Sequence, residues 1–404
     1  MLKNIISGLL VATMAIAGSA IAQSKQIKIG VIFDMSGALA AGGSNASYLG
    51  TKYAIDIINE RGGVEGYKIV PIYVDAQSKT EVAINETERL VNQEKVDVVM
   101  GVFSSAQCVP MAQRLDQAKK FMWANVCVSS AVFKDKNLKY IFRGQVHSDQ
   151  MGEASCKFLA ENSKSKFGKE IGDLKVAIIY EDGPYGAGVA MGNEVNCKQL
   201  GMQITLKEGY AATAPDLSAL VTKLRRARPD AILHTGYNPD ITLFLRQSKE
   251  QGLKWGALIG HGAGYGQFDK LFATFKEDAN YIYNVDPVAA QLIDPKALKP
   301  GLGAVTSEMI KRTDVLPRAI KKYGGIDSEA LRKSALDTDI PEGGTIQGYG
   351  VKFVPPGQSM SGQNERSTPV VHQYINNDTF VVWPNAIKSK DAVLPLPKGH
   401  SYAN

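Results

Sequence analysis

The stretch LKVAIIYEDGPYGAG, residues 174–188, joins an apolar run to a glycine-rich turn and then to a segment with helical periodicity. A short apolar run that ends at such a turn and is followed by a helix is typical of a buried parallel strand and its crossover helix. The same alternation recurs on both sides of this stretch. The sequence therefore predicts an α/β fold in which helices cover both faces of parallel sheets.

The strand-like runs form two series, separated near YIFRGQVHSD at residues 140–149. The first series is QIKIGVIFD (26–34), YKIVPIYVDA (67–76), VDVVMGVF (96–103) and KFMWANVCV (120–128), and the second is LKVAIIYED (174–182), QITLKEGY (203–210), PDAILHTGY (229–237) and KWGALIGHG (254–262). A chain of 404 residues is long enough for two hydrophobic cores. We expect two doubly wound lobes.

The N-terminus has the layout of a secretory signal peptide. Lys3 precedes an apolar core from Ile5 to Ala17, and Ala20-Ile21-Ala22 follows as a cleavage site. A membrane anchor is the alternative, but the core is shorter than the ~20 residues that span a bilayer. We expect residues 1–22 to be removed and the protein to be secreted into a bacterial periplasm.

Composition and motifs argue against several functions. The net charge of +6 is not gathered into a basic run with aromatic residues, so nucleic-acid binding is not expected. The loop LIGHGAGYGQF (258–268) spaces its glycines as G-x-G-x-G-x-G, which is not the dinucleotide fingerprint. Neither H-E-x-x-H nor G-x-S-x-G occurs, and the five histidines are scattered. We expect a binding protein without enzymatic activity, metal or cofactor.

Four cysteines would lie in an oxidising compartment, where three pairings are possible. Cys108 opens an expected helix and Cys127 ends the next strand at the same sheet edge, whereas Cys156 and Cys197 fall on two helices of the second lobe. We therefore favour the pairs Cys108–Cys127 and Cys156–Cys197. Free buried thiols are the alternative.

Small and aromatic polar residues follow the strands at their carboxyl ends, where open parallel sheets bind ligands. Ser104 and Ser105 follow one strand of the first lobe and Ser129 follows the next, while Tyr185 and Tyr237 follow strands of the second lobe. A serine at such a turn is also a common helix N-cap, and each tyrosine could belong to its own turn. As a group, the five residues predict a binding site between the lobes.

From Gln26 to about Trp383 the chain resembles the periplasmic solute-binding proteins of branched-chain amino-acid ABC importers, which have the type I periplasmic-binding fold. The resemblance is carried by IKIGVIFDMSGALA, AIDIINERGGVEGYKI, VDAQSKTEVAINETERLV, GVFSSAQ, VAIIYEDGPYGAG, PDLSALVTKLRRARPDAILHTGYNPD and LRQSKEQGLK. It implies three crossovers, near Gln145, Asn284 and Phe353. Residues 23–145 and 285–352 would form lobe one, and residues 146–284 and 353–404 lobe two.

The resemblance also implies roles for site residues. Ser105 or Ser104 and Ser129, with Cys127 in the same turn, would hold a ligand carboxylate, and Tyr185 and Tyr237 would cover the ligand when the lobes close. At the position where the amino-acid binders carry a glutamate for the ligand ammonium, this chain has His261 or Gly262. Near the N-terminus Gly42 replaces a tyrosine of those relatives and should widen the pocket.

These departures predict a carboxylate without an α-ammonium as the ligand. We place aromatic acids first, with Phe103, Tyr185, Tyr237 and Tyr265 as flat walls and His261 as a polar contact. The alternative is a branched-chain amino acid or amide, whose ammonium would be bound by a carboxylate that the sequence does not place. A sensory ligand-binding module and a nucleotide-using enzyme are less favoured.

The expected partners are the small carboxylate, an inner-membrane ABC permease and its ATPase, and we expect a monomer. One segment is shorter than in the family: between SEMIKR (307–312) and PRAIKKYGG (317–325) only Thr313 to Leu316 intervene. This shortening predicts altered packing in the late part of lobe one.

Overall fold

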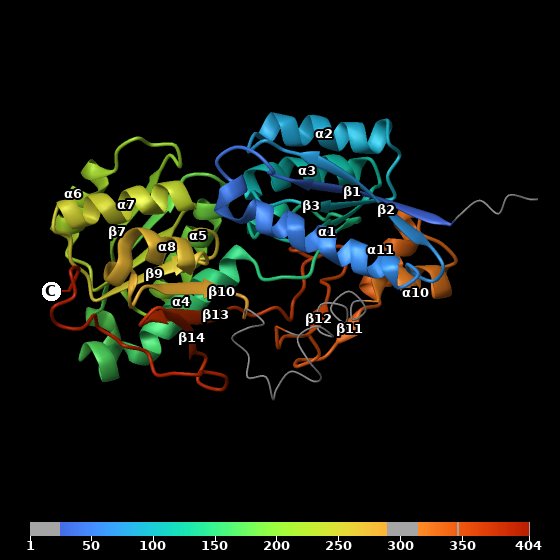
Figure 1. The fold of residues 1–404 in the computed structure, drawn as a ribbon. Helices are drawn as coiled ribbons and strands as arrows, with labels where there is room; N and C mark the ends of the chain where they lie inside the picture. Colours follow the sequence, from blue (N-terminus) through green and yellow to red (C-terminus); the bar gives the residue numbers. More distant parts are fainter. Residues whose placement is uncertain (1–24, 289–313, 346, 404) are drawn as a thin grey trace, which may run out of the picture.

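The computed structural model describes residues 25–288, 314–345 and 347–403, and it shows two lobes side by side, each built on its own sheet (Figure 1). The predicted signal peptide, residues 1–22, lies outside the described residues. In the described ranges no helix combines the length and apolar character needed to cross a membrane.

Lobe one is built on a five-stranded sheet of order β2-β1-β3-β4-β5 in which every pairing is parallel. Its strands are β1 (Gln26–Phe33), β2 (Lys68–Asp75), β3 (Val98–Gly101), β4 (Phe121–Ala124) and β5 (Ile141–Arg143). Its helical segments are η1 (Ala40–Ser44), α1 (Asn45–Glu60), α2 (Thr80–Asn92), α3 (Ser105–Gln117), η2 (Ser130–Val132), α10 (Val315–Tyr323) and α11 (Ser328–Leu336). The strands β11 (Asp339–Ile340) and β12 (Val351–Lys352) form a small antiparallel pair beside it.

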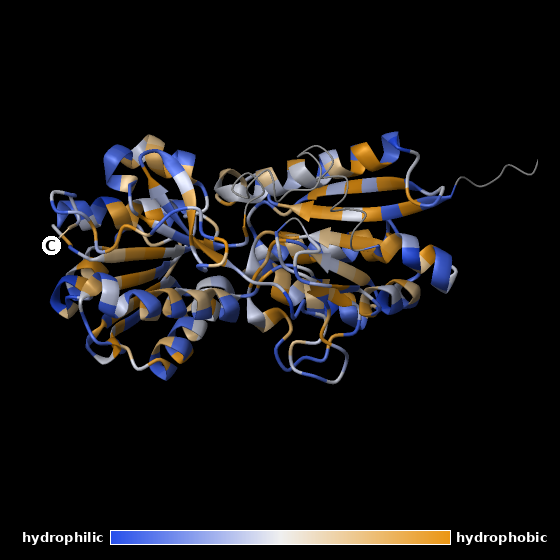
Figure 2. Ribbon diagram, turned by 90° about the horizontal axis from the view of Figure 1, so that it is seen from below, coloured by the Kyte–Doolittle hydropathy of each residue, from blue (hydrophilic) through white to orange (hydrophobic). Residues whose placement is uncertain are grey.

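Alternation along the strands gives this sheet a core on each face. In β3, Val98 belongs to one hydrophobic cluster and Val99 to the other, and Phe121 and Met122 of β4 divide in the same way. Successive side chains of a strand point to opposite faces, so a continuous apolar run requires cover on both sides. Figure 2 shows apolar residues concentrated along the strands of both lobes.

Lobe two is built on a seven-stranded sheet of order β14-β13-β10-β9-β8-β6-β7, with parallel pairing from β10 to β7 and antiparallel pairing of β13 with both neighbours. Its strands are β6 (Lys175–Glu181), β7 (Gln203–Tyr210), β8 (Ala231–Thr235), β9 (Ala257–His261), β10 (Tyr283–Asp286), β13 (Val370–Ile375) and β14 (Asp378–Trp383). Its helical segments are α4 (Ser148–Asn162), η3 (Ser163–Phe167), η4 (Ile171–Asp173), α5 (Pro184–Gln199), α6 (Ser218–Ala227), α7 (Asn238–Glu250), α8 (Phe268–Phe275) and η5 (Lys276–Ala279). The predicted α/β class with two sheets is confirmed.

The second crossover follows Asn284 closely, and the third lies later in the chain than the resemblance implied. Asn284 is still part of β10 and pairs with His372, so the chain leaves lobe two only after Asp286. Phe353 packs in lobe one, with its ring centroid 5.2 Å from that of Phe142, and the chain returns to lobe two after Asn364. Side-chain packing on lobe one, which the sequence pattern does not specify, sets this late return.

Both favoured disulfides are present. Cys108 at the start of α3 is bonded to Cys127 after β4, and Cys156 of α4 is bonded to Cys197 of α5. The four cysteines are buried within the two hydrophobic cores. The predicted pairing is confirmed, and the alternative of free thiols is not.

The short segment before α10 lies at the edge of the described residues. Arg312 and Thr313 fall outside them, and α10 begins at Val315. Val315 and Ala319 are buried in the core of lobe one, beside Leu331 of α11. The described part of this region is therefore packed despite the shorter sequence.

Candidate functional site

The three predicted serines come together at the carboxyl end of the lobe-one sheet. Ser104 precedes α3, Ser105 begins it, and Ser129 precedes η2; all three are buried. The Ser105 hydroxyl accepts a hydrogen bond from the backbone N–H of Ser129 at 3.2 Å. The Ser129 hydroxyl accepts from the N–H of Ala131 at 3.2 Å, so Ser129 does act as an N-cap. A hydroxyl that accepts a bond can still donate its own proton, so the cap role leaves Ser129 able to bind an anion.

Ser129 faces the other lobe. A Cβ placed on Gly188 of α5 would come 3.3 Å from the Ser129 hydroxyl oxygen. The serine pair is therefore at the junction of the lobes.

A buried arginine holds the turn that carries Ser129. Arg143, at the end of β5, donates from one terminal nitrogen to the carbonyls of Cys127 and Ser129, each at 2.9 Å, and from Nε to Gln363 at 2.6 Å. Burial lowers the pKa of Arg143 to about 9, which leaves it charged at neutral pH. Its positive charge next to the serine turn favours an anion there. Sequence reasoning did not single out this residue.

Cys127 has a different place from the one expected. Its sulfur is bonded to Cys108 and its carbonyl accepts from Arg143. Both groups have partners within lobe one, and contact of Cys127 with a ligand stays a prediction that neither group supports.

The two predicted tyrosines lie together and reach the other lobe through Phe103. The ring centroids of Tyr185 and Tyr237 are 5.3 Å apart, and that of Phe103, which follows β3, is 6.3 Å from Tyr237. A side-chain hydrogen bond joins Tyr237 to Ser104, although burial still raises the pKa of Tyr237. The Tyr185 hydroxyl donates to the backbone carbonyl of His261. Residues from both lobes thus form one aromatic cluster at the interlobe junction.

His261 is turned into the core of lobe two and not toward the interlobe junction. Its Nε2 lies 2.7 Å from the hydroxyl of Ser155, its Nδ1 lies 2.9 Å from that of Thr235, and the side chain is fully buried. Burial lowers the pKa of His261 to about 4, so the ring is neutral. Both ring nitrogens therefore already have partners within lobe two, and a polar contact between His261 and the ligand stays a prediction that this placement does not support.

The glycine-rich loop is explained by contacts within lobe two. A Cβ on Gly260 would lie 2.0 Å from the ring of Tyr265, which is fully buried in the core of lobe two, so its role as a wall for the ligand stays a prediction. Tyr265 instead bonds through its hydroxyl to Nδ1 of His234 at 2.6 Å. Gly262 has a φ of +43°, a left-handed conformation in which glycine is favoured and a glutamate would be strained.

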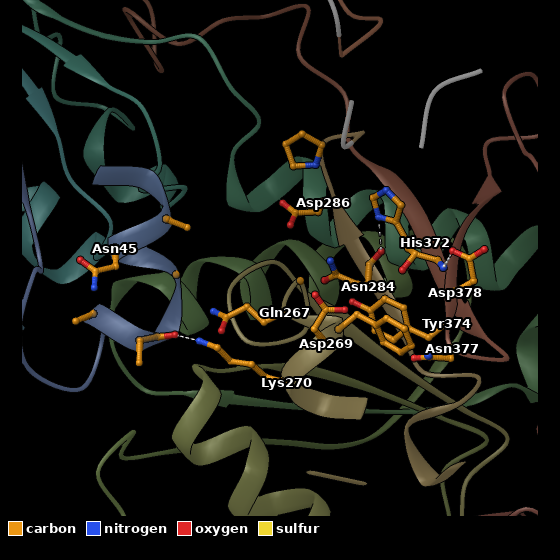
Figure 3. Close-up of a pocket in the computed structure, with 18 residues that line it drawn as sticks. Asn45, Gln267, Asp269, Lys270, Asn284, Asp286, His372, Tyr374, Asn377 and Asp378 are labelled. Carbon is orange, nitrogen blue, oxygen red and sulfur yellow. Dashed lines mark hydrogen bonds between the residues drawn. The ribbon is translucent and has the colours of Figure 1, made fainter. Parts of the chain in front are cut away.

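A cavity of about 620 Å³ lies between η1 and α1 of lobe one and the β10, β13 and α8 region of lobe two. Contacts across its edge come from Gln267 and Lys270, which donate to the carbonyls of Gly42 and Ala41. A Cβ on Gly42 would meet nothing within 4 Å, so there is open space at this position, and the widening of the pocket stays a prediction. Figure 3 shows Asn284, Asp286 and His372 on the lobe-two side of this cavity and Asn45 across from them.

Asp286 is the acidic residue that sequence reasoning missed. It ends β10, lines the cavity, and forms no ion pair among the described residues. Burial raises its pKa to about 7, and a hydrogen bond from the Asn284 side chain reduces the rise. The rule that site residues follow parallel strands could have identified it, because YIYNVD is a strand-like run that ends in this aspartate.

Comparison with known proteins decides the family. Residues 26–336 match the family described as periplasmic binding protein. The chain belongs to this family. This periplasmic binding protein is 31% identical over 396 residues to Leu/Ile/Val-binding protein homolog 7 of Brucella suis biovar 1 (strain 1330). The aligned residues cover 94% of this chain and 96% of the relative. It is 30% identical over 372 residues to homolog 8 of Brucella abortus (strain 2308), covering 89% and 90%.

Solved structures share the fold of this periplasmic binding protein. A leucine-binding protein from Thermotoga maritima aligns with a TM-score of 0.71 at 20% identity, over 87% of this chain and 97% of that one. A solute-binding protein from R. palustris in complex with 4-hydroxybenzoate aligns with a TM-score of 0.70 at 18% identity, over 91% and 98%. These solved structures show the fold, and the family match together with the Leu/Ile/Val-binding protein homologs identifies the chain as a periplasmic binding protein of the branched-chain amino-acid type.

Proposed function

We propose that this protein captures a small carboxylate-bearing solute between its lobes in the periplasm and delivers it to an inner-membrane ABC permease and its ATPase. The observation that carries the proposal is the buried pair of Ser105 and Ser129 at the lobe junction, with Arg143 bonded to the same turn. Two hydroxyl donors and a nearby positive charge favour an anion over a neutral group.

The ligands of structurally similar proteins support a carboxylate. One solved structure with a TM-score of 0.68 is a branched-chain amino-acid transporter substrate-binding protein from Streptococcus pneumoniae in complex with isoleucine, and another is the 4-hydroxybenzoate complex described above. Isoleucine and 4-hydroxybenzoate differ in size and in their other polar groups, and the carboxylate is the group that they share. In the proposed function the serine pair binds that shared carboxylate.

The choice between an aromatic acid and an amino acid depends on the rest of the site. Phe103, Tyr185 and Tyr237 provide aromatic surface for a flat ligand. The main argument against an amino acid was the missing acidic side chain at Gly262, and that argument is weakened because Asp286 lies beside Gly262. Both ligand classes contain the carboxylate on which the proposed function rests.

Ser129→Ala tests the proposal. Losing a hydroxyl that donates to a charged group should weaken carboxylate binding by ~1.5–3 kcal/mol, or about 10- to 150-fold in Kd. Calorimetry with a panel of amino acids, benzoates and short keto acids first identifies the ligand of the unsubstituted protein. The same measurement on Ser129→Ala then gives the loss of affinity for that ligand. Ser129→Thr, which keeps the hydroxyl, should retain most of the affinity.

Helix capping provides the control for Ser129→Ala. Loss of the cap alone would lower the free energy of unfolding by ~1 kcal/mol without a matching change in Kd. Thermal unfolding of the ligand-free variants measures that contribution separately. An unchanged Kd in Ser129→Ala would return this serine to a purely structural role and contradict the proposal.

A further inference from the structure

A buried carboxylate holds the turn that carries Tyr237. Asp240, in the first turn of α7, is only 3% exposed, and no cation is ion-paired with it in the ranges that the structure describes. Its Oδ1 accepts a hydrogen bond from the backbone N–H of Tyr237 at 2.8 Å. A buried carboxylate is costly unless hydrogen bonds or an opposite charge compensate for its lost hydration. The hydrogen bonds to Asp240 therefore indicate what this residue does.

A chain of hydrogen bonds fixes the second oxygen of Asp240. Its Oδ2 accepts from the hydroxyl of Tyr210 at 2.7 Å. The same hydroxyl lies 2.6 Å from Nε2 of His234, and Nδ1 of His234 lies 2.6 Å from the hydroxyl of Tyr265. These three buried side chains come from β7, from β8 and from the loop after β9. The chain of bonds therefore joins three strands of lobe two to the start of α7.

Two glycines leave room for this network. A Cβ on Gly236 would lie 2.4 Å from Oδ2 of Asp240 and 2.7 Å from the hydroxyl of Tyr210. A Cβ on Gly260 would overlap the ring of Tyr265 in the same way. Cβ atoms do not approach other atoms within 3.0 Å, so any side chain at either position would displace a member of the network.

The network has two arrangements of its protons, one for each charge state of Asp240. When the carboxylate is ionised, Tyr210 donates to it, so His234 must donate from Nε2 to Tyr210 and accept at Nδ1 from Tyr265. When Asp240 is protonated it donates to Tyr210, which then donates to Nε2, and the imidazole proton lies on Nδ1. The bond from the Tyr237 N–H is charge-assisted only in the first arrangement, and charge-assisted hydrogen bonds are about twice as strong as neutral ones.

Tyr237 reaches from this turn to lobe one. A side-chain hydrogen bond joins it to Ser104, and its ring centroid is 6.3 Å from that of Phe103. A side chain that is already held in place loses less conformational entropy when a ligand is enclosed, and such preorganisation raises affinity. The strength with which the turn is held should therefore affect ligand binding.

We propose that Asp240 is a positioning residue for Tyr237: its ionised carboxylate, bonded to Tyr210, fixes the turn from which Tyr237 meets lobe one. This inference rests on the proposed function, in which a solute is captured between the lobes, and it makes affinity higher when Asp240 is ionised. Burial raises the pKa of Asp240 to about 7, and the hydrogen bond from Tyr210 reduces this rise. Both charge states are therefore populated near neutral pH.

Most other titratable groups around Asp240 stay neutral in this range. Burial lowers the pKa of His234 to about 3. Burial raises the pKa values of the surrounding tyrosines, which are Tyr185, Tyr210, Tyr237 and Tyr265. Glu181, at the end of β6, is the second acid: its negative charge raises the pKa of Asp240, and burial raises its own pKa. A test must therefore separate Asp240 from Glu181.

The backbone amide of Tyr237 reports on Asp240 without any ligand. In NMR spectra of the ligand-free protein its chemical shift should titrate with a midpoint near pH 7, and Asp240→Asn should abolish that titration. Tyr210→Phe removes a donor to the carboxylate and should raise the midpoint, whereas Glu181→Gln removes a negative charge and should lower it. A shift that stays constant from pH 5 to pH 9, or that titrates unchanged in Asp240→Asn, would overturn the inference while leaving carboxylate binding intact.

Calorimetry tests whether this positioning affects the ligand. L-isoleucine, 4-hydroxybenzoate and pyruvate would be titrated into the unsubstituted protein and into Asp240→Asn at pH 8 and pH 5.5. For the tightest of the three, the variant should bind about fivefold more weakly at pH 8, and within about twofold at pH 5.5, where Asp240 is itself protonated. The pKa of Asp286 is also raised to about 7, but Asp286 is present in both proteins, so the ratio of their Kd values reports on Asp240.

A Tyr237→Ala background is the control for a purely structural effect. Asp240→Asn should change Kd there by less than about twofold at pH 8, because the side chain that it positions is gone. A loss of affinity that persists in that background, or a Kd ratio that is the same at both pH values, would overturn the inference. If no carboxylate of the panel bound to the unsubstituted protein, the proposed function and this inference would fail together, even with the amide titration present.

Discussion

At the residue scale, the raised pKa of Asp286 predicts an effect of this residue on stability in the absence of ligand. Its pKa is raised to about 7 by burial, against an ordinary value near 4. The folded state therefore binds the proton more tightly than the unfolded chain. The contribution of Asp286 to stability is greatest at low pH, falls as the pH rises from about 4 to 7, and stays low above that range.

Asp286→Asn should therefore stabilise the ligand-free protein at pH 8, by about 1–3 kcal/mol, and change it little at pH 4, because asparagine does not ionise. Of the groups facing Asp286, His372 has a pKa lowered to about 4 and the tyrosines 185, 349 and 374 have raised pKa values, so none changes charge between pH 5 and 8. Urea unfolding at several pH values measures the difference, with Asp378→Asn as the comparison. A gain in stability that did not depend on pH would show that Asp286 is not the titrating group.

At the scale of elements, the pair of helices α4 and α5 positions Tyr185. The two helices approach so closely that a Cβ on Gly152 would lie 2.3 Å from the backbone nitrogen of Asn193, and the Cys156–Cys197 disulfide joins them. This bond closes a longer loop than Cys108–Cys127, with sequence separations of 41 and 19. In the chain-entropy description a longer loop gives a greater stabilisation.

Replacing Cys156 and Cys197 together by alanine should lower the free energy of unfolding by roughly 4 kcal/mol, and replacing Cys108 and Cys127 by roughly 3 kcal/mol. Denaturant unfolding of the two double variants, with the fully oxidised protein as reference, gives both values. An equal or reversed order would mean that strain or residual structure in the unfolded chain, and not loop length, decides the contribution of these bonds.

At the scale of the whole molecule, groups from both lobes meet around the site, among them Ser130 of η2 and Ser148 of α4. Gln267 and Lys270 of lobe two donate to backbone carbonyls of η1, and Tyr237 meets Phe103. A solute bound to both lobes adds contacts that exist only when they are together, so it shifts the population toward the closed form.

Small-angle scattering should therefore show a smaller radius of gyration when the tightest-binding carboxylate of the calorimetric panel is added at saturation. Gln267→Ala, which removes a contact across the cavity edge, should shift the ligand-free protein further toward the open form and weaken binding. A scattering profile that saturating ligand leaves unchanged would count against closure as the means of capture.

The sequence by itself determined the elements of this protein and the sheet edge at which the candidate site residues lie. Local hydrophobic periodicity distinguishes strands from helices, and parallel strands bring the residues at their carboxyl ends to one edge of the sheet. For these reasons the two sheets, the serine and tyrosine positions and both disulfide pairs could be predicted from LKVAIIYEDGPYGAG and its neighbours. The direction in which each side chain points could not be predicted in this way.

Tertiary structure alone decided which side chains face the site. His261 and Tyr265 turn into lobe two because Ser155, Thr235 and His234, distant in the sequence, satisfy their polar atoms there. Asp286 comes next to Gly262 because β10 pairs with β9, a contact between strands more than 20 residues apart in the chain. Hydrogen-bond partners and burial are set by such non-local contacts, and local sequence patterns carry no information about them.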